Sequence, residues 1–254
     1  MNIALMREVS SKIIDCEITN ITRVPIEPFI AKEEHREYSK TLTELGYKVH
    51  MIEADDNLPD SVFIEDTAIV LDEVAIITHP GAASRRAETK AVAEALSMYR
   101  NLEYIGPTGT LEGGDVMKAG KTLYVGKSCR SSAVGIGLLR EIVKPYGYEV
   151  ISVPVNGCLH LKSAVTQVAE NTLLMNPAWV DPDDFSGFKV LTVHPSESYG
   201  ANALLLDGGI LYSIAFPKTR RKLIDEGFNV ISIDISELSK AEGDITCCSI
   251  ILNF

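Results

Sequence analysis

The sequence predicts an α/β fold in which about five ββαβ units close into a ring. The first observation is a four-residue phrase of glycine, an aromatic residue, any residue and valine, which begins at Gly46, Gly147, Gly187 and Gly227. The last three copies are 40 residues apart each time. A degenerate copy at residues 101–105 divides the long first interval into two further units. Self-similarity at such a period is typical of repeat architectures.

Each unit has the same predicted order of elements. The glycine phrase begins a short strand rich in β-branched residues, as at 150–153 and 230–233. An irregular segment leads into two more strands, for example 203–206 and 210–214, whose Asp-Gly-Gly connection is a strong hairpin signal. A helix then completes the unit, and the glycine or asparagine of the next phrase serves as its C-cap. The clearest helices are predicted at 84–100, 131–146 and 217–226.

The two chain ends indicate how the ring closes. The last unit lacks its helix and stops after residues 250–254, whereas the N-terminus supplies a strand at 2–6 and a helix at 31–45. Pairing the two ends would complete the fifth unit and remove the exposed strand edges. An open α/β sheet is the alternative, but the equal spacing of the phrases favours the ring. Because no break in composition marks a boundary, residues 1–254 are expected to form a single domain.

Composition and charge exclude several classes of protein. With 46% apolar and 23% charged residues, the chain is typical of soluble globular proteins. A formal net charge of −11 argues against a nucleic acid or an anionic membrane as partner. It fits a cationic small molecule, although acidity also keeps an ordinary protein soluble. Assembly into a homodimer stays open at this point.

The cysteines indicate a reducing environment. There are five, an odd number, and none shows the spacing of a zinc site. Neither a disulfide framework nor a structural metal site is therefore expected. Because the N-terminus lacks a signal-peptide pattern and no apolar run is long enough to span a membrane, we expect a cytoplasmic location.

Five segments that should meet at one end of the ring combine unusual residues. Each follows the glycine-phrase strand of its unit, so ring closure would gather them around the axis. They are residues 60–66, 111–115, 159–163, 196–199 and 243–248. A single buried cysteine is more often a small core residue than a reactive group. Equivalent placement of acids, a histidine and a cysteine in successive units favours one shared site.

The residue types in these segments indicate a specific chemistry. Cys247, His160 and Glu112 can serve as a nucleophile, a general acid–base and the group that orients it. The acids at 60–66 suit a planar guanidinium cation, which would also lower the pKa of a nearby cysteine. These residues therefore predict attack of a thiolate on a guanidinium or amidinium carbon. Arg85 and Arg130 are suitably placed to clamp a carboxylate of the same molecule.

At these residues the sequence resembles the dimethylarginine dimethylaminohydrolase family. That family is part of the guanidino-modifying superfamily, which also contains arginine and agmatine deiminases and amidinotransferases. The resemblance extends over nearly the whole chain and implies a five-bladed α/β-propeller with pseudo-fivefold symmetry, the pentein fold. The segments that carry it are residues 59–66, 77–81 with 84–89, 110–115, 160–163 and 246–249.

The resemblance implies a catalytic role for three positions. Cys247 would be the nucleophile, and Cys248 only its neighbour. His160 would protonate the departing amine and later activate water, while Glu112 would hold and polarise that histidine. No metal or other cofactor is implied.

Substrate binding is implied for eight further positions. Glu65 and Asp66 would bind the guanidinium group, and Asp60, Arg85 and Arg130 would grip the amino-acid end. The remaining positions are Ile18, on a mobile N-terminal lid at residues 10–29, and the backbone near Ala241 and Glu242, which would contact the substrate amine. The lid is the segment least similar to the family.

One detail bears on the substrate. Superfamily members that act on free arginine or agmatine typically carry His-x-Asp, and that aspartate binds the second guanidino nitrogen. This chain has His160-Leu161-Lys162 instead, which favours an N-methylated substrate. The resemblance thus implies conversion of asymmetric dimethylarginine or monomethylarginine to L-citrulline and dimethylamine or methylamine, through a covalent thiouronium on Cys247.

Three alternatives stay open. The enzyme could act on arginine or another substituted guanidine, or the chain could be a non-catalytic binder of cationic amino acids. Cys247, Cys248 and His160 could also capture zinc as an inhibitor, since thiolate and imidazole are preferred zinc ligands. Both a preformed Cys247–His160 ion pair and deprotonation of Cys247 on substrate binding are compatible with the sequence.

Overall fold

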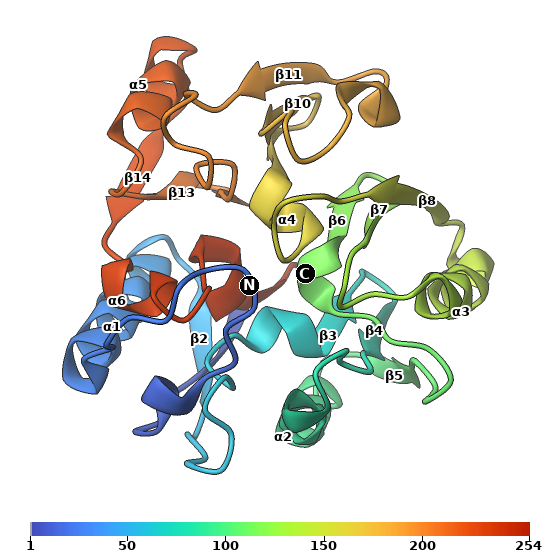
Figure 1. The fold of residues 1–254 in the computed structure, drawn as a ribbon. Helices are drawn as coiled ribbons and strands as arrows, with labels where there is room; N and C mark the ends of the chain where they lie inside the picture. Colours follow the sequence, from blue (N-terminus) through green and yellow to red (C-terminus); the bar gives the residue numbers. More distant parts are fainter. Residues whose placement is uncertain (1) are drawn as a thin grey trace.

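The computed structural model describes residues 2–254 as five three-stranded sheets arranged around a central axis (Figure 1). The sheets are β15 (Ile250–Leu252), β1 (Ile3–Arg7) and β2 (Lys48–Ile52); β3 (Ala68–Val70), β4 (Val74–Ile77) and β5 (Asn101–Tyr104); β6 (Val116–Ala119), β7 (Thr122–Lys127) and β8 (Glu149–Pro154); β9 (Val165–Ala169), β10 (Thr172–Met175) and β11 (Lys189–Thr192); and β12 (Leu204–Leu206), β13 (Gly209–Ser213) and β14 (Val230–Ile233). The predicted ring of five units is confirmed.

Helices connect and surround these sheets. The α-helices are α1 (Pro28–Glu44), α2 (Thr89–Leu96), α3 (Ala133–Val143), α4 (Leu161–Ala164), α5 (Pro217–Asp225) and α6 (Ser236–Ser239). The 3₁₀ helices are η1 (Ile13–Asp15), η2 (Ile64–Thr67), η3 (Ala83–Glu88), η4 (Gly113–Asp115), η5 (Lys144–Tyr146), η6 (Pro182–Phe185) and η7 (Ile245–Cys248). No helix within residues 2–254 is long and apolar enough to cross a membrane.

Every sheet has the same internal order. The inner strand pairs antiparallel with the middle strand, and the middle strand pairs parallel with the outer one. A parallel pair needs a crossover, and α1, α2, α3 and α5 provide it on the outside of the ring (Figure 1). The fourth sheet uses η6 for this connection.

The glycine phrase ends a sheet rather than beginning one, which corrects the predicted unit boundary. Its strand is the outer strand, so the irregular segment after it leads into the inner strand of the next sheet. Gly147 and Gly227 have φ angles of +75° and +90°, which only glycine adopts readily at a helix C-terminus. The phrase therefore recurs where a crossover helix stops and turns into an outer strand.

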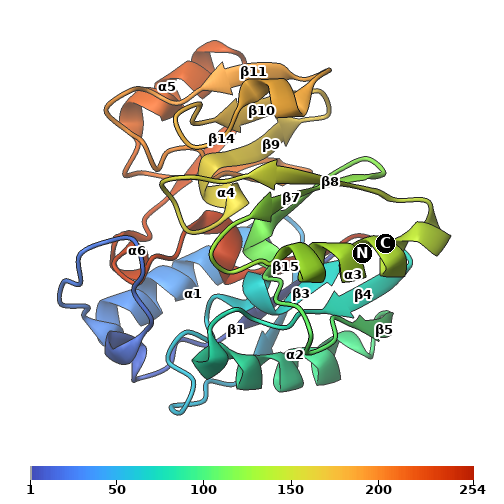
Figure 2. The same cartoon turned by 45° about the vertical axis from the view of Figure 1, so that its right-hand side comes forward.

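Ring closure by the chain ends is also confirmed. β1 pairs antiparallel with β15, with Ile3 opposite Leu252, and parallel with β2. Figure 2 shows the two termini side by side. The predicted helix at 84–100 is divided into η3 and α2, because Arg85 and Glu88 turn into the interior.

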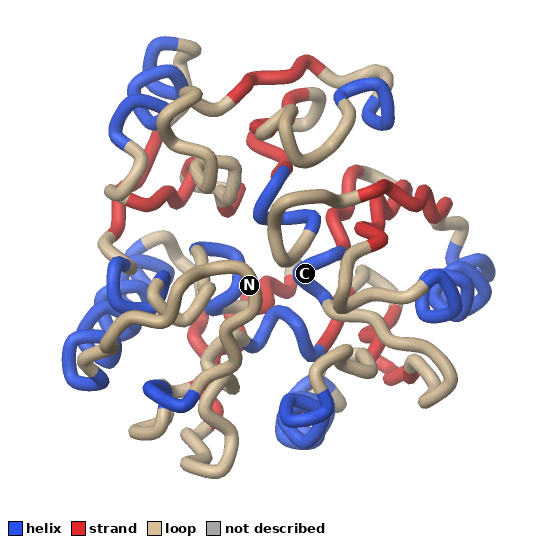
Figure 3. Tube along the Cα trace, in the orientation of Figure 1, coloured by secondary structure: helices blue, strands red, loops and turns tan. Residues whose placement is uncertain are grey.

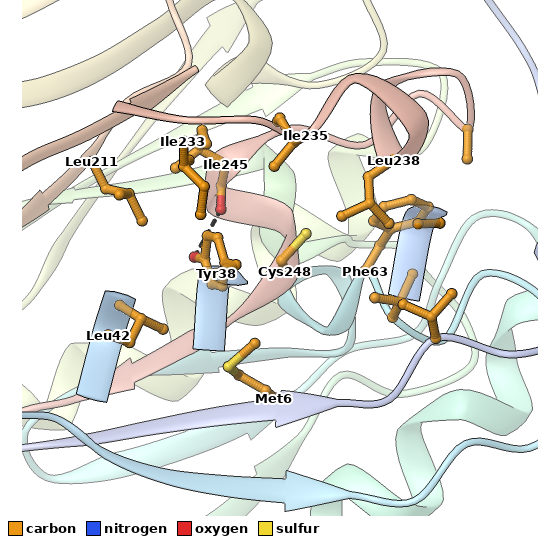
Figure 4. Packing of buried hydrophobic residues seen from close by; sticks show 14 of the residues in the cluster. Met6, Tyr38, Leu42, Phe63, Leu211, Ile233, Ile235, Leu238, Ile245 and Cys248 are labelled. Carbon is orange, nitrogen blue, oxygen red and sulfur yellow. Dashed lines mark hydrogen bonds between the residues drawn. The ribbon is translucent and has the colours of Figure 1, made fainter. Parts of the chain in front are cut away.

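A buried cluster beneath α1 fixes the C-terminal segment that carries the cysteines (Figure 4). Tyr38 is fully buried, and its hydroxyl donates to the carbonyl of Ile245 at 2.9 Å and lies 2.8 Å from Ser249 Oγ. Cys248 packs in the same cluster with no exposed surface. Packing against α1 and the first sheet thus holds η7 in place.

Candidate active site

Short helical segments at one end of the ring carry the candidate residues. η2, η4, α4 and η7 lead into the inner strands of four different sheets, so they occupy equivalent positions (Figure 3). Glu65 and Asp66 lie in η2, and Cys247 lies in η7. Glu112 and His160 are the residues immediately before η4 and α4. A single local geometry therefore aims different side chains at the axis.

The predicted contribution of residues 196–199 is wrong. The carboxylate of Glu197 accepts hydrogen bonds from the backbone N–H groups of Lys218 and Thr219 at 2.9 and 2.7 Å. These groups form the first turn of α5, where a carboxylate is favourable. In this sheet Asn202 takes the equivalent position: its side chain donates to Lys162 O and accepts from Thr246 N, both at 3.0 Å.

His160 lies buried between carboxylates. Its Nε2 is 2.7 Å from Glu112 Oε2 and 3.8 Å from Asp66 Oδ1. Burial alone would lower the pKa of His160, but the charges of Asp66, Glu112 and Asp115 outweigh it and raise the pKa to about 9. The ring is therefore an imidazolium at neutral pH.

Asp66 is held as a carboxylate by the cations around it. Arg85 Nη1 donates to its Oδ2 at 2.6 Å, and the backbone N–H of Gly114 donates to its Oδ1 at 3.0 Å. Burial raises the pKa of Asp66, yet His160 and Arg85 overcome this and lower it to about 2. Arg85 in turn is held by Glu88, with Nη2 at 2.9 Å from Oε2.

The surroundings of Cys247 favour the protonated thiol. Burial raises the pKa of its thiol well above the ordinary value, and the carboxylates of Glu65 and Asp66 add to the effect. A preformed thiolate is thus disfavoured in the free protein. A cation placed beside the sulfur would reverse the sign of the local charge.

A closed cavity of about 20 Å³ lies between these groups. Its lining residues are Glu17, Asp60, Phe63, Asp66, Arg85, Arg130, Leu159, His160, Ala241, Glu242 and Cys247. This volume holds about one water molecule and is too small for an amino acid. We call it the reactive cavity.

Residues 17–20, in the segment predicted to be a lid, form hydrogen bonds with several of the residues predicted to bind substrate. The N–H of Glu17 donates to both oxygens of Asp60 at 3.1 and 3.2 Å. Glu242 accepts from the N–H of Asn20 at 2.7 Å, and Arg130 Nη2 donates to Thr19 Oγ1 at 2.9 Å. Residues 17–20 thus occupy polar groups of Asp60, Arg130 and Glu242.

A second, larger cavity of about 400 Å³ is lined by all five inner strands. Glu65 lines this central cavity and not the reactive one. Its Oε1 is 2.5 Å from Lys162 Nζ, and its Oε2 accepts from Thr246 Oγ1 at 2.8 Å. Glu65 and Asp66 are thus separated into two cavities, with the Lys162–Glu65–Thr246 contacts forming the wall between them.

The remaining predicted positions divide in a similar way. Asp60, Asp66, Arg85, Arg130, His160, Ala241, Glu242 and Cys247 line the reactive cavity, and Glu112 lies behind His160. Ile18 does not line it but packs half-buried against the core. Glu17, Phe63 and Leu159 line it without having been predicted, since nothing in their residue types signals reactivity.

The metal-capable group in residues 2–254 differs from the predicted zinc set. Ligand atoms of Asp66, Glu112 and His160 lie within 4.8 Å of one another. Cys248 cannot join Cys247 and His160 at the reactive cavity, because its thiol is buried in the core and faces Asp244 O at 3.7 Å.

A ring of five ββαβ sheets with a cysteine, a histidine and acids at one end of the axis defines a protein of the guanidino-modifying superfamily, with the pentein fold. Residues 26–183 match the family model described as N,N dimethylarginine dimethylhydrolase, eukaryotic. The N(G),N(G)-dimethylarginine dimethylaminohydrolase of Streptomyces coelicolor is 39% identical over 250 residues, which cover 97% of this chain and 95% of that one. The chain belongs to the dimethylarginine dimethylaminohydrolase family, whose members are hydrolases acting on C–N bonds.

Two further comparisons agree. The enzyme of the same name from Pseudomonas aeruginosa is 33% identical over 222 residues, covering 87% of each chain. A crystal structure of a cysteine-to-serine mutant of the Pseudomonas aeruginosa enzyme, complexed with citrulline, superimposes with a TM-score of 0.91 at 29% identity and covers 98% of both chains.

Proposed function

We propose that this protein hydrolyses Nω-methylated L-arginine to L-citrulline and methylamine or dimethylamine. The observation that carries the proposal is a buried imidazolium, His160, that shares one small cavity with the Cys247 thiol and the Asp66 carboxylate. A proton donor, a nucleophile and a fixed anion are the three groups that displacement of an amine from a guanidinium needs.

Binding would begin with opening of the lid. Asp66, kept ionised by Arg85, is the anion that meets the guanidinium group. Arg130 Nη1 is buried 3.5 Å from Glu112 Oε1 but makes no hydrogen bond in the described part of the chain, so it can also meet the carboxylate of the substrate. Asp60 and Glu242, once released by the lid backbone, are acceptors for the substrate amine.

Bound guanidinium would then prepare the nucleophile. Its positive charge counteracts the carboxylates that raise the pKa of Cys247, so the thiol loses its proton to solvent when the substrate is in place. Of the two protonation schemes that the sequence allows, this environment supports deprotonation on binding.

The chemistry then proceeds in two displacements. Cys247 Sγ forms a bond to the guanidinium carbon; the C–N bond breaks, and the amine leaves with the electron pair and a proton from His160. Water next attacks the thiouronium carbon and gives one proton to His160; the C–S bond breaks, and the sulfur takes up the second proton to restore the thiol. Glu112 keeps the imidazole oriented in both steps through its 2.7 Å contact.

The preference for a methylated nitrogen is supported by Lys162. Where relatives acting on arginine carry an aspartate, this lysine neutralises Glu65 and draws it toward the central cavity. No further carboxylate then demands hydrogen bonds from the second guanidino nitrogen, which can carry methyl groups. We further propose that residues 1–254 act as one catalytic unit in the reducing cytoplasm, where the five free cysteines stay reduced.

A substrate panel tests the proposal. Purified protein is incubated with asymmetric dimethylarginine, monomethylarginine, arginine and agmatine, and citrulline or carbamoylputrescine is followed. Citrulline from the methylated substrates, abolished by Cys247→Ser, is expected. Preference for arginine would overturn the substrate assignment and leave the chemistry standing. No product from any of the four, with Cys247 also unlabelled by a haloacetamidine, would favour a binding protein.

A further inference from the structure

Asp115 ends the Glu112-Gly113-Gly114-Asp115 motif, yet the proposed mechanism gives it no role. Its side chain is completely buried and lines neither the reactive nor the central cavity. A buried carboxylate is costly unless hydrogen bonds compensate it. The partners of Asp115 therefore indicate what it does.

The carboxylate connects two segments that carry reactive residues. Asp115 Oδ1 accepts from the backbone N–H of Leu161, the amide directly after His160, at 2.9 Å. Asp115 Oδ2 accepts from the hydroxyl of Ser128 at 2.6 Å. Since Leu161 begins α4, this bond fixes the extended backbone of His160, whose φ and ψ are −132° and 161°.

Two serines extend the connection to the other cavity residues. Ser128 Oγ accepts from the N–H groups of Arg130 and Ser131 at 3.0 and 3.2 Å. Ser131 Oγ accepts from the N–H of Glu112 at 3.1 Å. One carboxylate thus ties together the backbones of His160, Arg130 and Glu112, which come from three separate segments.

Glycines let these groups approach closely. A Cβ at Gly126 would lie 2.6 Å from Asp115 Oδ1, and a Cβ at Gly114 would lie 2.8 Å from His160 Nδ1. Both contacts are shorter than any side chain allows, so the carboxylate and the imidazole are each pressed against bare backbone.

From these contacts we infer that Asp115 is a positioning residue for His160: it holds the backbone at His160 through the Leu161 N–H, and its negative charge stabilises the imidazolium. The second part follows from Coulomb attraction in a buried site, where opposite charges interact strongly. Asp115 is one of the acids that raise the pKa of His160. The inference depends on the proposed function only in what it predicts for kcat. The position and the titration of His160 can be measured directly.

The charged and titratable groups around this pair determine how a test must be read. Those facing His160 are Asp66, Glu112, Asp115 and the Cys247 thiol across the cavity, with Arg85 and Arg130 behind the acids. Cys158 is also close, and its Sγ donates to His160 O at 3.3 Å. A substitution of Asp115 leaves the other groups in place.

Asp115→Asn is the decisive variant, because asparagine can still accept from Leu161 N–H while the charge is gone. Proton titration of the His160 ring, followed by histidine-selective NMR, is expected to move to lower pH by roughly one unit. The alkaline limb of kcat should move with it, and kcat should fall on the order of tenfold while KM changes less than about threefold. An unchanged His160 titration and pH profile would overturn the inference.

Ser128→Ala is the matched variant, because it keeps the charge and breaks the link to Arg130 and Ser131. It should lower kcat by about threefold to tenfold without moving the His160 titration. Wild-type kcat in this variant would overturn the positioning role, and it decides the question if Asp115→Asn fails to fold. Asp72→Asn, at an exposed ion pair with Lys118, is the surface control and should change neither quantity.

The two proposals fail in different ways. If the wild-type protein hydrolyses no methylarginine but Asp115→Asn still shifts the titration of His160, the proposed function fails and the inference about Asp115 stands. If methylarginine is hydrolysed equally by wild type and Asp115→Asn, with the same pH profile, the reverse holds.

Discussion

Glu65 and Asp66 are consecutive acids, both buried, yet their pKa values are shifted in opposite directions. Burial raises the pKa of Glu65, and Lys162 does not fully compensate. Burial acts on Asp66 as well, but His160 and Arg85 lower its pKa to about 2. Asp66 faces the reactive cavity and Glu65 the central cavity. The charged groups around each acid, and not its residue type or its position in the sequence, therefore decide which acid stays ionised.

Removing the two acids in turn gives the largest expected effect. Asp66→Asn removes one of the two carboxylate partners of Arg85 and a counter-charge of His160, so kcat/KM for a methylarginine should fall by roughly 10³-fold or more. Glu65→Gln keeps the contact to Thr246 and should cost only about tenfold. Steady-state kinetics of the two isosteric variants measure the difference. Equal losses of kcat/KM would contradict the different roles assigned to Asp66 and Glu65.

The wall between the cavities gives the next effect. Lys162→Met removes the cation from a pair whose side chains are only 15% and 11% exposed, which leaves Glu65 as an unpaired buried charge. Breaking such a pair typically costs about 3–5 kcal/mol, measurable by urea unfolding. The double variant Glu65→Leu with Lys162→Met should regain much of that loss, because no charge is then stranded. Wild-type stability of Lys162→Met alone would show that the ion pair does not hold the wall.

The pH dependence of turnover tests the protonation state of His160 in the reactive cavity. The pKa of His160 is raised from 6.5 to about 9, so its stabilising charge is complete below pH 6.5 and is lost as pH rises through about 9. If the imidazolium donates the proton to the leaving amine, kcat should fall about tenfold per pH unit above that value.

The Cys247 thiol provides an independent reading of the same cavity. Because its pKa is raised well above 9.0, alkylation of the free protein by iodoacetamide should be slow at neutral pH and accelerate with added hydroxide. In Asp66→Asn the reaction should be faster, since one repelling carboxylate is gone, whereas a rate unaffected by that change would contradict the assigned cause.

Much of this arrangement follows from the sequence, because the repeat is a local pattern. The glycine phrases mark where crossover helices end, and they placed the outer strands β8 and β14 almost to the residue. The ring also identified which segments meet at the axis. Local rules such as helix capping act through neighbours in the chain and are therefore readable.

What the sequence could not resolve depends on contacts between distant segments. Glu65 and Asp66 are adjacent in the sequence, and their different surroundings depend on Lys162, which is 97 residues from Glu65. Glu197 resembled a site residue until its two bonds to the start of α5 assigned it to a helix cap. Asp115 stood inside a recognised motif, but its role depends on Ser128 and Leu161, which carry no signal of their own.

Cys247 and Cys248 are also adjacent in the sequence and lie in different surroundings. Cys247 borders the reactive cavity, whereas Cys248 packs with no exposed surface beneath α1 (Figure 4). Cys248→Ser places a hydroxyl in an apolar cluster, although the nearby Asp244 carbonyl can accept its hydrogen bond. The free energy of unfolding should therefore fall by about 1–2 kcal/mol, while kcat per folded molecule stays within about twofold of wild type. Cys129→Ser, at an exposed position, is the control and should change neither. A large loss of kcat in Cys248→Ser, with stability intact, would mean that the two cysteines share the chemistry.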